Sequence, residues 1–146
     1  MEGFQTPILL TTFNRPEETQ RVFSEIRKQK PRYLYIFADG PRSQEEKILT
    51  DQTRKIVQNI DWACELKIKF EEKNLGCKIG MSSAITWFFS NVEMGIILED
   101  DCLPHPDFFR FCEELLKKYW DNPQVMLISG DNFQNGIRRG NDSYYF

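Results

Sequence analysis

Residues 94–109 read MGIILEDDCLPHPDFF and join an apolar run, three consecutive carboxylates and an aromatic segment. The run "GIILED" (95–100) is nearly continuous in apolar residues before its acids, which is typical of a strand covered on both faces of a sheet. Pro106 and Asp107 then stand where a helix begins. The stretch therefore predicts a buried strand, a charged turn and a helix, the repeating unit of a parallel α/β sheet.

Three further apolar runs have the character of residues 95–100. They are "PILLTTF" (7–13), "YLYIFAD" (33–39) and "VMLISGD" (125–131). The segment "ELKIKFEE" (65–72) instead alternates apolar and charged residues. That alternation predicts a half-exposed strand at the edge of the sheet.

Helix signals separate these runs. Pro16 is followed by two acids, Ser43 and Glu46 form a capping box, and Ser82 and Ser83 precede an aromatic helical segment. The last helix is expected to bury one stripe, made of Phe108, Cys112, Leu115 and Tyr119. The order βαβαβαβαβ predicts an α/β domain over residues 1–146, with a mostly parallel sheet and helices on both faces.

Composition narrows the functional classes. The net charge is −3, and no cluster of Lys and Arg offers a nucleic-acid-binding surface. Cysteines at 64, 77, 102 and 112 lack the spacing of a zinc site, and we expect them to be reduced. We find no signal peptide and no 18-residue apolar stretch. These features predict a cytoplasmic protein without a transmembrane segment.

Polar residues follow each predicted strand. Ligands in parallel sheets bind beyond the carboxyl ends of the strands, near the point where strand order reverses. The acids Glu99, Asp100 and Asp101 follow the fourth strand. Acids fixed at a strand end suit a hard cation such as Mg²⁺ or Mn²⁺ that also binds substrate phosphates. The alternative is a solvated acidic turn before the helix.

Each of the other strand-end residues has both a ligand-binding and a purely structural interpretation. Asp39, in "FADGPR", can accept hydrogen bonds from a ribose hydroxyl or a base imide, or it can cap its own Asp-Gly-Pro turn. The segment "KNLGCKIGMSS" (73–83), with Lys78, is a phosphate-facing loop before a helix or a plain connection. Arg15 is a phosphate ligand or a solvated cation. His105, between two prolines, is interpreted as a helix-start residue.

With these residues assembled, residues 6–133 resemble the nucleotide-sugar-binding half of a GT-A glycosyltransferase. The resemblance is closest to the metal-dependent N-acetylglucosaminyltransferases that act on mannose and to related bacterial sugar transferases. Its most specific segment is "IILEDDCLPHPDFFRFCEELL", while "PILLTTFNRPE", "FADG" and "NLG" match more loosely. The resemblance implies the Rossmann-like nucleotide-diphospho-sugar transferase fold.

Residue roles follow from the resemblance by position. It implies that Asp101 is the direct ligand of Mn²⁺ or Mg²⁺, and that Glu99 and Asp100 shape the site and contact the sugar or ribose. It also implies that Asp39 reads the nucleobase and that Arg15 helps to hold the nucleotide.

One position departs from the family pattern. The residue 21 positions before the acids is a histidine in the better-known relatives, and here it is Lys78. We place Lys78 among the expected nucleotide contacts.

The implied activity is glycosyl transfer from a nucleoside diphosphate sugar, expected to be a UDP-sugar, to a hydroxyl of a glycan or other acceptor. Asp131 is a candidate acceptor-side acid, and no residue is assigned as the base. Because acceptor-binding parts are not matched, we expect a fold that is incomplete at the C-terminus, with Tyr144–Phe146 starting a further segment. The alternative function is a non-catalytic nucleotide-sugar-binding or regulatory module. A phosphoacceptor receiver would need paired acids after the first strand, where this chain has "TTFNR".

Overall fold

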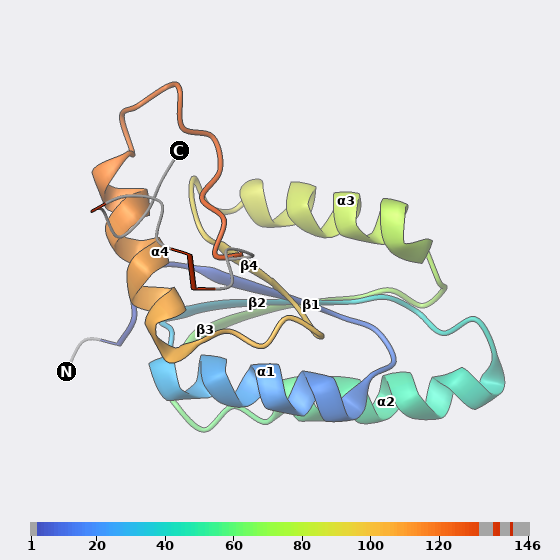
Figure 1. The fold of residues 1–146 in the computed structure, drawn as a ribbon. Coiled ribbons are helices and arrows are strands. Elements are labelled where there is room, and N and C mark those ends of the chain that lie inside the picture. The colour runs from blue at the N-terminus through green and yellow to red at the C-terminus, as the bar shows by residue number, and fades with distance from the viewer. Residues whose placement is uncertain (1–2, 132–135, 138–140, 142–146) are drawn as a thin grey trace.

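A computed structural model describes residues 3–131, 136–137 and 141, and in these residues strands and helices alternate (Figure 1). The elements are β1 (Ile8–Thr12), α1 (Pro16–Gln29), β2 (Tyr33–Ala38), α2 (Gln44–Gln58), β3 (Glu65–Phe70), α3 (Gly76–Phe89), β4 (Ile96–Glu99) and α4 (Pro106–Lys118). The strands form one parallel four-stranded sheet in the order β3-β2-β1-β4. The predicted Rossmann-like α/β architecture is confirmed, and β3 is an edge strand as expected.

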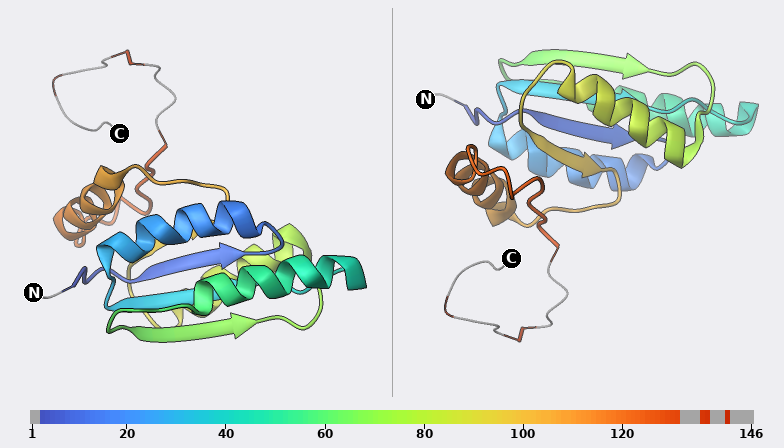
Figure 2. Two further views of the ribbon diagram at one scale, coloured as in Figure 1. Left: turned by 90° about the horizontal axis from the view of Figure 1, so that it is seen from below. Right: turned by 90° about the horizontal axis from the view of Figure 1, so that it is seen from above.

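Helices cover both faces of the sheet. Figure 1 shows α1 and α2 below it and α3 above it, and Figure 2 shows the same layers from the two faces. Alternate residues of β1 enter the two cores: Ile8 packs with α1 and α2, whereas Leu9 packs with α3. This period of two in strands buried on both faces explains why their sequences read as unbroken apolar runs.

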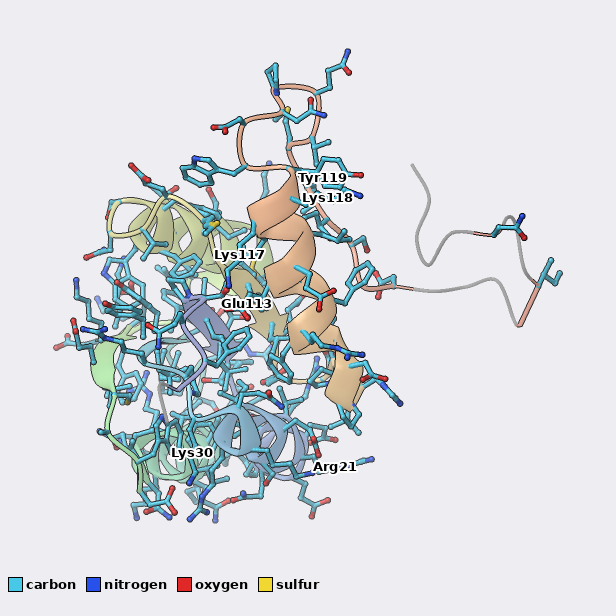
Figure 3. The ribbon with its side chains drawn as sticks, turned by 90° about the vertical axis from the view of Figure 1, so that its left-hand side faces the viewer. Arg21, Lys30, Glu113, Lys117, Lys118 and Tyr119 are labelled. Carbon is cyan, nitrogen blue, oxygen red and sulfur yellow. The ribbon has the colours of Figure 1, made fainter. Side chains whose placement is uncertain are left out.

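The last helix, α4, lies beside the amino ends of the strands (Figures 1 and 2). Its Phe109 ring meets Phe4 edge to face, with 6.0 Å between centroids. The Thr6 hydroxyl donates to Glu113 at 3.2 Å. Figure 3 shows Glu113 with Lys117 on this helix, where they pair at 3.3 Å. These contacts hold α4 at the end of the sheet opposite the carboxyl ends of the strands (Figure 1).

The core stripe of α4 differs slightly from the prediction. Phe109 is fully buried, and Cys112 and Leu115 are buried as predicted. Phe108 and Tyr119 are only half-buried. Phe109, and not Phe108, is therefore the phenylalanine of this pair that α4 buries most deeply in the core.

Three predicted helix starts are confirmed. Pro16 occupies the first turn of α1. The Ser43 hydroxyl accepts a hydrogen bond from the Glu46 amide at 3.2 Å. His105 caps α4, because its Nδ1 accepts from the Asp107 amide at 3.3 Å. Side-chain acceptors of this kind satisfy amides that have no partner within the helix.

The predicted start of α3 at Ser82 and Ser83 is wrong, because the helix begins at Gly76. Its first amides are capped by Asp39, a residue far away in the sequence. Local sequence alone therefore could not locate this terminus.

The predicted strand over residues 125–131 is also wrong. The segment has no regular structure, and the side chains of Met126 and Leu127 are 94% and 84% exposed. Among the described residues, β4 pairs only with β1, so residues 125–131 have no ladder of hydrogen bonds to join. The expected segment at Tyr144–Phe146 lies outside the described residues.

Candidate functional site

The order of strands reverses beside β1. From β1 the chain continues to β2 on one side, and β4 lies on the other side. In parallel sheets this reversal leaves a crevice at the carboxyl ends of the two flanking strands. Here those ends carry Phe13 and Arg15 after β1, and Glu99, Asp100 and Asp101 at the end of β4.

The structure brings Arg15, Asp100 and Asp101 together. The Arg15 guanidinium contacts the carboxylate of Asp101, and its Nη1 lies 3.6 Å from Asp100 Oδ1. Asp100 is also tied to the end of β1, because its Oδ2 accepts a hydrogen bond from the Phe13 amide at 3.1 Å. A single cationic nitrogen thus lies within ion-pair distance of both carboxylates.

The two acids have opposite electrostatic character. Burial raises the pKa of Asp100 above its usual value, and the Phe13 amide and Arg15 offset part of that effect. The hydrogen bond from Arg15 lowers the pKa of Asp101, which is about half exposed. The same contact raises the pKa of the Arg15 guanidinium. Arg15 therefore favours the ionised form of both acids, whereas burial opposes ionisation most strongly at Asp100.

Glu99 ends β4 beside Thr11 of β1, and its side chain is exposed at the same edge. Nearby, the pKa of the Cys102 thiol is raised by burial first, and then by the charges of Asp101, Glu99 and Asp131. Asp131 is exposed, and its charge acts on the Cys102 thiol.

The oxygen atoms present fit a divalent cation. Carboxylate oxygens suit Mg²⁺ and Mn²⁺, and Mg²⁺ is commonly held by one or two carboxylates together with substrate phosphates. Arg15 already bridges Asp100 and Asp101, so a positive group can sit between them. Among the described residues, no group of three or more His, Cys, Asp and Glu side chains could by itself hold a metal ion. A metal here would need ligands from its substrate as well.

Asp39 forms a second cluster, at the end of β2. It is buried, and its carboxylate accepts four hydrogen bonds: from the amides of Gly40, Leu75 and Gly76 and from the Asn74 side chain, at 2.8 to 3.1 Å. A carboxylate has about four acceptor positions, so the side chain is fully engaged. Its negative charge at the amino end of α3 also favours the helix dipole.

Two residues that the sequence did not predict at the site, Arg54 and Glu46, hold these loops. Arg54 of α2 donates from Nη2 to the carbonyls of Asp39 and Glu71, at 3.1 and 2.6 Å, and so joins the ends of β2 and β3. Glu46 accepts from the Asn14 side chain at 2.7 Å and pairs with Arg42, which lowers its pKa to about 2. The capping box pointed to Glu46, whereas no local pattern pointed to Arg54.

Lys78 belongs to α3, the helix whose start Asp39 caps. It is exposed in the first turn of α3 and lines a groove of about 540 Å³ with Lys69, Ser83 and Trp87, among other residues. None of the acids at the end of β4 lines this groove. The structure therefore does not place Lys78 against Arg15, Asp100 and Asp101.

No family model matches this chain, and no curated protein matches it in sequence. Among the described residues, no helix has both the length and the apolar composition needed to cross a bilayer. The strand-end residues and their contacts are therefore the features that indicate a function.

Proposed function

We propose that this chain binds a nucleoside diphosphate sugar, specifically a UDP-sugar, together with Mn²⁺ or Mg²⁺, and serves as the donor-binding part of a glycosyltransferase. The observation that carries the proposal is the pair Asp100 and Asp101, bridged by the Arg15 guanidinium at the reversal of strand order. The motif resemblance of residues 96–116 supports the same assignment.

The proposed roles follow from exposure and charge. Asp101, half exposed, would bind the metal, while buried Asp100 would keep the turn against β1 through the Phe13 amide. When bound, the metal would stabilise the negative charge of the diphosphate leaving group as a Lewis acid. Glu99, exposed at the same edge, would contact the sugar or ribose. Arg15 would bind phosphate, for which its planar guanidinium is suited.

Asp39, at the end of β2, and Lys78, in the first turn of α3, would act on the nucleotide from a second position at the carboxyl ends of the strands. Because all four acceptor positions of Asp39 are occupied, its contribution would come through the loop 74–76 that it holds beside the nucleobase. Lys78, exposed in the first turn of α3, would contact the nucleotide from there. The acceptor would be a hydroxyl of a glycan or another molecule, with Asp131 as the candidate acid on that side.

The test is a thermal-shift titration with UDP, UDP-sugars and GDP-mannose, each with Mn²⁺ and with excess chelator. A ligand at 100 times its dissociation constant stabilises a protein by about 2.7 kcal/mol. We expect stabilisation by uridine compounds with Mn²⁺ only. Asp101→Asn should abolish it. Asp51→Asn is the matched control, because Asp51 is also ion-paired and is 45% exposed, against 46% for Asp101.

Equal stabilisation in chelator would contradict the metal site, and no stabilisation by any nucleotide would contradict the whole proposal. Donor hydrolysis or transfer, measured as released UDP, then separates a transferase from a module that binds without turnover.

A further inference from the structure

We propose that Arg15 is the resident counter-ion of the acidic site, so that a divalent metal and a diphosphate enter the site as a coupled pair. This inference rests on the proposed function for the identity of the diphosphate. It adds that metal alone binds weakly, because Arg15 occupies Asp101, and that the diphosphate removes this competition.

The backbone of Arg15 is held while its side chain is accessible. Its carbonyl accepts the first hydrogen bond of α1, from the Thr19 amide at 2.9 Å, and Pro16 follows it directly. Its side chain is 50% exposed, and that of its partner Asp101 is 46% exposed. The guanidinium can therefore leave Asp101 by rotation of its side chain without any change in β1 or α1.

The acids differ in how freely they can change partner. Asp100 is buried and keeps the Phe13 amide whatever cation is present. Asp101 has no backbone amide of another strand or helix among its contacts, and its main partner is the Arg15 guanidinium. Asp101 is thus the acid at which a divalent metal would replace the Arg15 guanidinium.

Charge explains the coupling. A divalent ion approaching Asp101 meets a guanidinium that is permanently positive, so the two repel each other and compete for the same oxygen atoms. A diphosphate gives Arg15 a new anionic partner with bidentate geometry. Metal therefore displaces Arg15 at lower cost when diphosphate is present, and by linkage diphosphate binds more tightly when metal is present.

The experiment measures free Mn²⁺ by electron paramagnetic resonance during titration of the protein, with and without UDP. In the wild type we expect UDP to tighten Mn²⁺ binding by about 5- to 150-fold, the usual range of coupling between sites. In Arg15→Gln we expect tighter binding of Mn²⁺ alone. We also expect a smaller coupling factor than in the wild type, which stays above one because phosphate oxygens still supply metal ligands. Arg15→Lys, which keeps the charge, should behave more like the wild type.

Arg27→Gln is the matched control, because it removes one positive charge from the other end of α1, where Arg27 pairs with Asp61. It should leave both titrations unchanged. The inference is overturned if Arg15→Gln leaves the affinity for Mn²⁺ alone unchanged, or if Arg27→Gln raises it equally. If Mn²⁺ binds and responds to Arg15→Gln but UDP has no effect, the counter-ion is supported and the nucleotide proposal fails. If Mn²⁺ binds none of the proteins with or without UDP, both are overturned.

Discussion

The carboxylate of Asp39 accepts a hydrogen bond from the Gly76 amide at 3.1 Å, and this contact joins the end of β2 to the first turn of α3. The same carboxylate accepts from Leu75, Gly40 and Asn74. A residue expected to read a base is therefore also the cap of a helix, and the two roles make different predictions.

Asp39→Ala should lower the free energy of unfolding on the order of 3 kcal/mol, because it leaves several part-buried donors without an acceptor. Urea unfolding measures the loss, and amide exchange should increase first in residues 75–78. Nucleotide binding by the folded fraction should also weaken by about 1–3 kcal/mol. Unchanged stability with lost binding would instead identify Asp39 as a direct ligand and not a cap.

Gly40→Ala should be destabilising by about 1–3 kcal/mol, the usual cost of overpacking. A Cβ at this position would lie 2.4 to 2.6 Å from backbone atoms of Lys73, which cannot move aside as a flexible side chain could. Gly76→Ala is the comparison, since its Cβ would meet nothing within 4 Å and its cost comes only from a φ of +76°. Thermal melting of both variants compares the cost of a backbone clash with that of a positive φ alone. An unchanged Tm in Gly40→Ala would contradict the close approach of Lys73.

Asp100→Asn should raise the free energy of unfolding at neutral pH, and the Tm with it. Burial raises the pKa of Asp100 in the folded state, so ionisation costs more there than in the unfolded chain. The cost is relieved as pH falls through the folded pKa toward the unfolded value. The advantage of the variant, measured by melting across pH, should therefore shrink as pH falls. Lower stability at pH 7 would show that the ion pair with Arg15 outweighs burial.

Asp101→Asn should instead lower the free energy of unfolding at neutral pH. The Arg15 contact depresses the pKa of Asp101 in the folded state, so its contribution is present above the unfolded pKa and lost as pH falls through the folded pKa. Because both side chains are about half exposed, the loss at neutral pH should be only about 0.2–1 kcal/mol. Chemical denaturation at pH 7 and in strong acid measures it, and global unfolding of the variant at pH 7 would show that Asp101 is structural.

Thiol labelling should follow burial. Burial raises the pKa of Cys112 to about 11, so in the native protein it should resist a thiolate-directed reagent near neutral pH. Cys77 and Cys102 are exposed and should react, but Cys102 more slowly, because burial and the nearby acids raise the pKa of its thiol. Cys102 lies beside Asp101 and should be protected further by UDP with Mn²⁺. Mass spectrometry of the labelled peptides measures the order in which the cysteines react. Rapid labelling of Cys112 in the folded protein would contradict its packing in the core.

Local sequence determined most of the secondary structure. The strands β1, β2 and β4 follow from unbroken apolar runs, and β3 from its alternation, because a strand buried on two faces excludes polar residues and an edge strand does not. Pro16, the Ser43 cap and His105 mark helix starts through contacts within three residues. The acids after β4 could likewise be recognised as a candidate site from their position alone.

The tertiary structure decided which residues meet. Arg15 and Asp101 are 86 residues apart, and only the adjacency of β1 and β4 brings them into contact. The start of α3 depends on Asp39, and the ends of β2 and β3 depend on Arg54 of α2. Residues 125–131 have the composition of a strand but no partner among the described residues. Secondary-structure propensity depends on local sequence, whereas hydrogen-bond partners and counter-ions come from residues that are distant in the sequence and close only in the folded chain.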